Sequence, residues 1–167
     1  MSINSLVKAG AIAKYDEPLQ FISFKLADEV YGVEILKVRE IIRMTPITKM
    51  PNAPRQMEGI INLRGSVIPI ISIRRRFNLV EHENGGQERI IIMDVCGTSV
   101  GFIVDAVSEV IRIQSSEIQP PPSMALSGGI GQEFITGVFN HAERLLIIID
   151  INLMFTDGER EDFGGIM

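Results

Sequence analysis

The residues that could carry chemistry are few in this chain, and they stand far apart in the sequence. His82 lies in a polar stretch and His141 at the tip of an expected hairpin, so we interpret both as solvated turn residues. The single cysteine, Cys96, ends an apolar run and is expected to be a small buried residue. No paired Cys or His spacing typical of a zinc site occurs.

The acidic and basic residues give no better candidate for catalysis. Asp94, Asp105 and Asp150 each follow an apolar run, and without a His or Lys partner they are expected to act as caps. Gly129-Ile130-Gly131 is not followed by a helical pattern, so it is no nucleotide fingerprint. Arg74-Arg75-Arg76 could contact phosphate, but such a run on a short helix is typically a solvated face. We therefore expect a protein that is not an enzyme and that holds no cofactor and no metal.

Composition narrows the class of protein further. Of the 167 residues, 46% are hydrophobic and only 6% aromatic, so the core must be aliphatic. A chain of this length can bury such a core without disulfides, and a single cysteine fits a reducing compartment. The net charge of −5 argues against nucleic acid or an anionic membrane as the main partner.

The elements that must position any site are short strands. The clearest stretch is Met57–Ile73, where two branched apolar runs flank a corner at Arg64 and Gly65. Such runs predict buried strands, and Gly65 can take the positive φ that a tight turn needs. The aliphatic stem of Arg64 can lie on a core while its charged head reaches water or a carboxylate.

The same pattern returns later in the chain. Gly59-Ile60-Ile61-Asn62 aligns with Gly137-Val138-Phe139-Asn140, and Tyr31–Arg43 aligns with Val100–Arg112. Chance similarity between apolar strands explains the matched Ile and Val, but it explains the matched Gly, Asn, Glu and Arg less well. We therefore predict a duplication, with a polar linker at Glu81–Gln87 between the two copies.

About ten short strands and a few short helices are expected. Leu36–Ile42 and Asp105–Ile111 each fit a helical turn as well as an irregular strand. Short helices are predicted over Pro54–Gly59 and after the caps Ser72 and Asp150. Because closure removes exposed edges, repeated antiparallel strands favour barrels. The predicted fold class is mainly β, with two small five-stranded β-barrel subdomains, SH3-like or OB-like, that share a core; exchange of strands between them is left open.

The domain organisation follows from the same pattern. We expect a flexible N-terminal tail over residues 1–18, one two-part unit over 19–157 and a frayed C-terminal tail over 158–167. The two subdomains should cover about 19–80 and about 88–157. The apolar part of the N-terminal tail is too short and too broken for a signal peptide or a membrane span.

A surface for other proteins is the remaining candidate site. Val38–Ile42 and Val107–Ile111 are equivalent under the duplication, and they carry more branched apolar residues than a connection needs. If they approach each other between packed barrels, they would frame an apolar groove for an amphipathic helix, with Glu40 and Glu109 at its rims. The alternative is that these residues form the core between the barrels.

The order and spacing of several motifs resemble those of the CheW family, the coupling (adaptor) proteins of bacterial chemotaxis. The resemblance runs from about Gln20 to Phe155. It rests on Glu29-Val30-Tyr31-Gly32, Ile35–Ile41, Pro51-Asn52-Ala53-Pro54, Gly59–Gly65, Ile68-Pro69-Ile70, Val104–Val110, Thr136-Gly137 and Leu146–Asp150. Ser72 departs from the pattern, since the family often has an acidic residue there, and the run Arg74–Arg76 is more basic than expected.

This resemblance implies two intertwined β-barrels without catalysis or a cofactor, acting in two-component signal transduction. The implied partners are the regulatory domain of the CheA histidine kinase and the cytoplasmic tip of methyl-accepting chemotaxis receptors. The implied location is the cytoplasm, at membrane-associated receptor arrays, without membrane insertion. The family's receptor-binding groove maps onto Val38, Glu40, Ile41, Arg64, Val107 and Val110. Its kinase-binding loop maps onto Ile47, Met50 and Asn52, and its structural signature onto Asn62 and Gly65.

Functions of two other classes remain as alternatives. A nucleic-acid-binding protein built on similar small barrels would require exposed stacking aromatics and a basic groove. The chain has no Trp and only two Tyr, which disfavours that function. An enzyme would require a titratable cluster, which the sequence does not offer.

Overall fold

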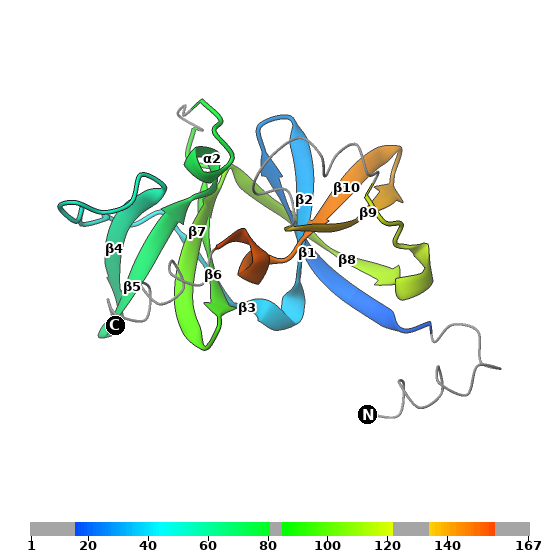
Figure 1. Cartoon of the computed structure of the whole chain (residues 1–167), viewed down its shortest axis with the longest axis horizontal. Helices are drawn as coiled ribbons and strands as arrows, with labels where there is room; N and C mark the ends of the chain where they lie inside the picture. The colour runs from blue at the N-terminus through cyan, green and yellow to red at the C-terminus, as the bar shows by residue number, and fades with distance from the viewer. Residues whose placement is uncertain (1–15, 81–84, 122–133, 156–167) are drawn as a thin grey trace.

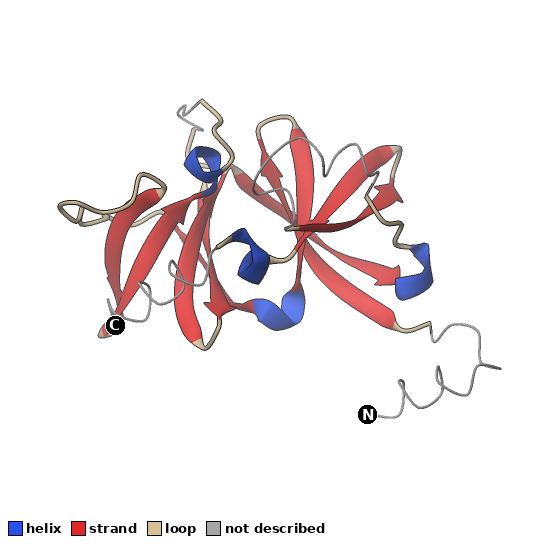
Figure 2. Cartoon of the chain, in the orientation of Figure 1, coloured by secondary structure: helices blue, strands red, loops and turns tan. Residues whose placement is uncertain are grey.

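The fold consists of two five-stranded β-sheets that lie side by side, with a few short helices around their junction (Figure 1). The computed structural model describes residues 16–80, 85–121 and 134–155. The predictions for most of the two tails, for His82 and for Gly129–Gly131 lie outside these residues. The described part confirms a mainly β protein built from two five-stranded units with little helix (Figure 2).

The strands fall into two sheets of equivalent order. Sheet A has the order β8-β1-β2-β10-β9, and sheet B has the order β3-β6-β7-β5-β4. Sheet A contains β1 (Pro18–Leu26), β2 (Glu29–Glu34), β8 (Ala106–Gln114), β9 (Ile135–His141) and β10 (Arg144–Ile149). Sheet B contains β3 (Val38–Arg43), β4 (Met57–Leu63), β5 (Ser66–Ser72), β6 (Arg89–Val95) and β7 (Thr98–Val104). The short helices of the described part are η1 (Ile35–Lys37), α2 (Ile73–Arg76), η2 (Ser115–Glu117) and η3 (Ile151–Met154).

Each sheet takes strands from both copies of the repeat. Sheet A combines β1 and β2 of the first copy with β8, β9 and β10 of the second, and sheet B combines the rest. The registers are equivalent too, since Val38 opposes Met93 in sheet B as Val107 opposes Phe24 in sheet A. In both sheets a register shift adjoins this pair. The structure thus confirms the duplication, and it shows the strand exchange that the sequence leaves open.

Tight turns fix these registers, and the turn between β4 and β5 is the clearest example. Arg64 and Gly65 both have positive φ, 51° and 90°, which gives a two-residue turn whose twist matches antiparallel strands. The amide of Gly65 donates to Oδ1 of Asn62 over 2.8 Å, so the Asn62 side chain braces the turn. The positive φ expected at Gly65 is confirmed, and Arg64 shares it despite the steric cost of its Cβ.

The segment between β3 and β4 is extended and not helical. The helix predicted over Pro54–Gly59 is wrong, because β4 already begins at Met57. Thr48 holds the segment against β4, since its N–H and C=O both pair with Ile60, over 2.9 and 2.8 Å. A Cβ on Gly59 would lie only 2.3 Å from the Thr48 carbonyl oxygen, so this close approach depends on glycine.

The other local predictions resolve clearly. Leu36–Ile42 divides into part of η1 and most of β3, whereas most of Asp105–Ile111 is the start of β8. The short helices expected after Ser72 and Asp150 are both present. Oγ of Ser72 accepts a hydrogen bond from the amide of Arg75 over 3.3 Å, and the Asp150 carboxylate accepts one over 2.9 Å from the amide two residues on. These caps satisfy amides that have no partner within the helix.

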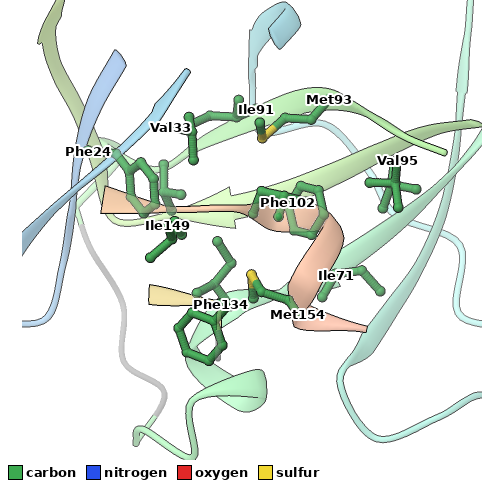
Figure 3. Packing of buried hydrophobic residues seen from close by; sticks show 14 of the residues in the cluster. Phe24, Val33, Ile71, Ile91, Met93, Val95, Phe102, Phe134, Ile149 and Met154 are labelled. Atoms are coloured by element: carbon green, nitrogen blue, oxygen red, sulfur yellow. The ribbon is translucent and has the colours of Figure 1, made fainter. Parts of the chain in front are cut away.

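A shared hydrophobic core joins the two sheets. Figure 3 shows buried side chains that converge from both, with Phe24 and Val33 from sheet A and Ile91 and Phe102 from sheet B. A row of four aromatic rings adds to this cluster: Phe24, Tyr31, Phe77 and Phe134. Successive ring centroids in the row are 5.8, 5.6 and 5.0 Å apart, within the range for favourable aromatic contact. Because burial of apolar surface is the main stabilising term, the two sheets share their largest source of stability.

A buried ion pair connects the two sheets beside this core. Arg74 of α2 donates from Nε and Nη2 to the two carboxylate oxygens of Asp105, over 2.9 and 2.6 Å. Asp105 lies between β7 of sheet B and β8 of sheet A, and its Oδ2 also accepts from the amide of Ala27 in the β1–β2 turn over 2.8 Å. Arg74 is 9% exposed and Asp105 is 8% exposed. The hydrogen bonds to Asp105 raise the pKa of Arg74 above its ordinary value, so its guanidinium stays charged.

The prediction that Arg74-Arg75-Arg76 forms a solvated face is therefore wrong. Arg75 lies 2.9 Å from the carboxylate of Glu58, and Nε of Arg76 donates to the Met154 carbonyl over 3.0 Å. Asp105, expected to be a cap, is half of the buried ion pair. Because α2 is only one turn long and is surrounded by other elements, its three arginine side chains contact those elements and do not form a solvent-exposed face.

Asp105→Ala should lower the free energy of unfolding by about 3–5 kcal/mol, because it leaves the buried Arg74 charge without its partner. Urea unfolding followed by circular dichroism measures this loss. The double variant Arg74→Met with Asp105→Ala removes both charges and should recover much of the stability. If Asp105→Ala lowers the free energy of unfolding no more than Glu143→Ala, a substitution in an exposed turn, the ion pair does not stabilise the fold.

Candidate functional site

The residues predicted for a partner surface centre on β3, an edge strand of sheet B. Glu40 meets Arg64 of the β4–β5 turn, whose Nη1 donates to Oε2 over 3.1 Å and whose Nη2 donates to Oε1. Two parallel hydrogen bonds are a strong geometry for an arginine and a carboxylate. These hydrogen bonds hold the pKa of Glu40 below its ordinary value and raise the pKa of Arg64. The expectation that the head of Arg64 reaches water or a carboxylate is confirmed.

A second ion pair braces the same strand. Nη2 of Arg39 lies 3.3 Å from Oδ1 of Asp94, next to the β6–β7 turn, and Nη1 of Arg39 donates to the hydroxyl of Ser99. Farther along β3, Ile41 leaves 37% of its surface exposed. Because successive side chains of a strand point to opposite faces, Ile41 lies on the face opposite to Glu40 and its ion pair.

Val38 and Val107 occupy equivalent places at the two crossovers between the sheets. Both are half-buried and pack against the central cluster, as the alternative interpretation of these segments expects. Val38 follows η1, and Val107 follows the crossover at Asp105. In Figure 1 these crossovers lie on opposite sides of the junction. The structure therefore places Val38, Glu40, Ile41 and Arg64 on sheet B, and it places Val107 and Val110 on sheet A.

On β8 the equivalent surface carries Val110, which is 52% exposed. The neighbouring carboxylate of Glu109 lies 3.5 Å from Nε2 of His141, the last residue of β9. Oγ of Ser23 donates to the Glu109 carbonyl over 2.8 Å and accepts from its amide over 3.1 Å, which fixes β8 at this point. His141, expected in a solvated turn, is thus a partly exposed strand residue beside a carboxylate.

An apolar cavity of about 310 Å³ opens at the junction of the sheets. Its apolar lining includes Leu19, Phe21, Val33, Met93, Ile118 and Ile148, and charged side chains from Glu34, Lys37 and Asp150 join them. Met93 supplies the sheet B side, and it is the cross-strand neighbour of Val38. Sequence reasoning missed this cavity, because η1, η3 and the segment after β8 come together only through the strand exchange.

The loop predicted to bind a kinase lies between β3 and β4. Met50 is 39% exposed, and Asn52 is exposed with a positive φ of 61°. Ile47 points the other way and packs against the hydrophobic cluster inside sheet B. The three residues therefore divide into two that face solvent and one that anchors the loop.

Potential metal-ligating side chains do not cluster in the described part of the chain. Among them, no group of three or more His, Cys, Asp or Glu side chains is arranged to hold a metal ion. Cys96, expected to be buried, is exposed in the β6–β7 turn with a φ of 52°, because the buried strand ends one residue earlier at Val95. Its amide donates to Oδ1 of Asn152 over 3.1 Å, which ties this turn to η3. Helices of the described part are all too short to cross a membrane.

Comparison with known proteins decides the family. The family model of the CheW-like domain matches residues 20–159. The chemotaxis protein CheW of Treponema pallidum (strain Nichols) is 35% identical over 159 residues, which cover 93% of this chain and 92% of that protein. This chain belongs to the CheW-like family.

Two further CheW proteins agree with this assignment. The CheW of Klebsiella aerogenes is 34% identical over 140 residues, which cover 84% of this chain and 83% of that protein. The crystal structure of the scaffolding protein TtCheW from Thermoanaerobacter tengcongensis is 38% identical, with a TM-score of 0.76 over 85% of this chain and 91% of that one. The resemblance in the sequence motifs is thus confirmed. As a member of the CheW-like family, the chain is a chemotaxis scaffold (adaptor) and not an enzyme, and these relatives give no support to nucleic-acid binding.

Arg64→Ala should return the pKa of Glu40 toward its ordinary value of 4.5, because it removes the hydrogen bonds that lower it. An NMR titration of the Glu40 side-chain carboxyl carbon measures this shift. Since the pKa of Glu40 is lower in the folded chain than in the unfolded one, the pair stabilises the fold above the unfolded pKa and loses this effect as pH falls through the folded pKa.

The stability difference between the wild type and Arg64→Ala should therefore shrink as the solution is acidified through that range. Arg43→Ala, at an exposed position on the same strand, serves as the control. A Glu40 pKa that is the same in the wild type and in Arg64→Ala would show that the ion pair is absent in solution.

Proposed function

We propose that this CheW-like protein couples methyl-accepting chemotaxis receptors to the CheA histidine kinase. The observation that carries the proposal is the exposed apolar side chain of Ile41 on the edge strand β3 of this CheW-like chain. The receptor tip is expected to be a helical hairpin, and an amphipathic helix suits an apolar groove with polar rims. Apolar burial would supply affinity, and the charges at the rim would set the orientation of the helix.

The proposed receptor-binding residues are Val38, Glu40, Ile41, Arg64, Val107 and Val110. Support on the sheet B side comes from exposed Ile41 on the edge strand β3 and from the Glu40–Arg64 pair, which fixes the same strand. That pair joins β3 to the β4–β5 turn, so this part of the surface exists before the partner arrives, which lowers the entropic cost of binding. Exposed Val110 would provide a second contact on sheet A.

The proposed kinase-binding residues are Ile47, Met50 and Asn52, which would meet the regulatory domain of CheA. The loop suits this role because it is anchored on two sides, by Ile47 in the cluster of sheet B and by the pairing of Thr48 with Ile60. It therefore presents Met50 and Asn52 from a fixed base. Two surfaces on one small chain would let a receptor and the kinase bind together, in the cytoplasm at membrane-associated receptor arrays.

Ile41→Asp should weaken receptor binding by about tenfold or more and leave CheA binding intact, because it places a charge in an apolar contact. Met50→Asp should weaken CheA binding and leave receptor binding intact. Co-sedimentation with receptor-containing membranes measures the first interaction, and titration calorimetry with purified CheA measures the second. Both positions are exposed, so circular dichroism should show an unchanged fold.

Val80→Asp, at an exposed apolar position near α2, is the matched control and should change neither interaction. Val110→Asp reports whether the surface on sheet A takes part. Failure of the wild type to bind either partner would reject the coupling function itself. Unchanged binding in Ile41→Asp and Met50→Asp would keep the function and reject the proposed surfaces.

A further inference from the structure

The two sheets differ at one pair of equivalent ends. In sheet B, Arg39 pairs with Asp94 and Glu40 pairs with Arg64, so two ion pairs span this end. Under the duplication, the equivalent residues in sheet A are Ser108, Lys25, Glu109 and Ala142, as the matching registers show. Ser108 cannot form an ion pair with Lys25, and Ala142 cannot form one with Glu109, so sheet A lacks the equivalents of both ion pairs.

Where those pairs are missing, sheet A has a cavity of about 290 Å³. All five strands of the sheet contribute to its lining. Its floor is apolar and includes Val30, Ile111 and Leu146, of which the last two are only 5% and 1% exposed. Such an apolar floor with a few polar groups above it is typical of a site for a small ligand.

The polar side chains of this cavity carry more positive than negative charge. Lys25 and Arg144 stand against one carboxylate, that of Glu109. Arg144 is anchored, because its Nη2 donates to the carbonyl of Asp28 in the β1–β2 turn over 2.8 Å. The residue equivalent to Arg144 in sheet B is Ser66, so only sheet A has a cation at this position.

We propose that this cavity binds a small organic anion, namely a carboxylate attached to a short apolar or aromatic group. The apolar group would lie on Val30, Ile111 and Leu146, and the carboxylate would lie at Lys25 and Arg144. An arginine and a lysine at the edge of an apolar floor provide both contacts that such a molecule needs. This inference rests on the difference between the sheets and not on the proposed coupling of receptors to a kinase, so each can fail alone.

Titration of 3-phenylpropionate into the full ¹⁵N-labelled chain tests the proposal. It should give saturable amide shifts on the strands that line the cavity, with Ile111 and Leu146 among them. The neutral 3-phenylpropanol and the cationic 3-phenylpropylamine have nearly the same shape. We expect the alcohol to bind about fivefold more weakly than the acid, and the amine more weakly still, because only the acid is attracted to both cations.

Two variants introduce residues of sheet B at the equivalent positions of sheet A. Ala142 has a φ of 50°, close to the 51° of Arg64, so Ala142→Arg fits the turn and should pair with Glu109 and close the cavity to all three compounds. Lys25→Asp introduces the residue that Asp94 provides in sheet B. It should weaken binding of the acid by about tenfold and leave binding of the alcohol unchanged.

Ser66→Ala, at the equivalent of Arg144 in sheet B, is the control and should have no effect on binding. Thermal unfolding by circular dichroism checks that each variant is folded. An absence of saturable shifts, equal affinity for the acid and the amine, or undiminished binding of the acid by Ala142→Arg would overturn the proposal.

Discussion

The Arg74–Asp105 ion pair is the interaction on which the relative position of the two sheets depends. One carboxylate binds the guanidinium of α2 and the amide of the β1–β2 turn at the crossover between β7 and β8. A buried charge pair is tolerated only when its hydrogen bonds are satisfied, so this contact permits few arrangements. The apolar core alone would be less selective, because burial of hydrophobic surface is not directional. A scaffold needs such definition, since its proposed binding surfaces lie on both sheets.

Duplication supplies two copies of every surface, and charged side chains make the copies unequal. In sheet B, Arg39–Asp94 and Glu40–Arg64 span one end. At another place in sheet B, Arg74 and Asp105 line a polar cavity of about 210 Å³. Sheet A has an apolar cavity of about 290 Å³ at the end where those pairs are missing, and another apolar cavity of about 310 Å³ opens at the junction of the sheets. Two identical faces would bind the same partner twice, whereas unequal faces allow one chain to bind different molecules.

The sequence predicts the strands, the turns and the duplication, because these depend on local signals such as branched apolar runs and Gly65. It does not predict the partner of Arg74, which lies on the other side of a sheet crossover. The predicted groove residues divide for the same reason: strand exchange leaves Val38 on sheet B and places Val107 on sheet A. Cys96 shows a smaller limit of prediction from sequence. The buried strand ends at Val95, so an error of one residue in the strand end decides whether Cys96 is predicted to be buried or exposed.

Strand exchange also imposes an order on the folding of the newly made chain. Sheet B is built from the contiguous strands β3 to β7, whereas sheet A needs strands from both ends of the sequence. During synthesis sheet B can therefore be completed first, while the β1–β2 hairpin waits for β8 on one edge and β10 on the other. Unpaired strand edges are sites of misassociation between chains. The N-terminal hairpin is thus the segment through which two nascent copies would exchange strands, and a domain-swapped dimer is the assembly error that this topology invites.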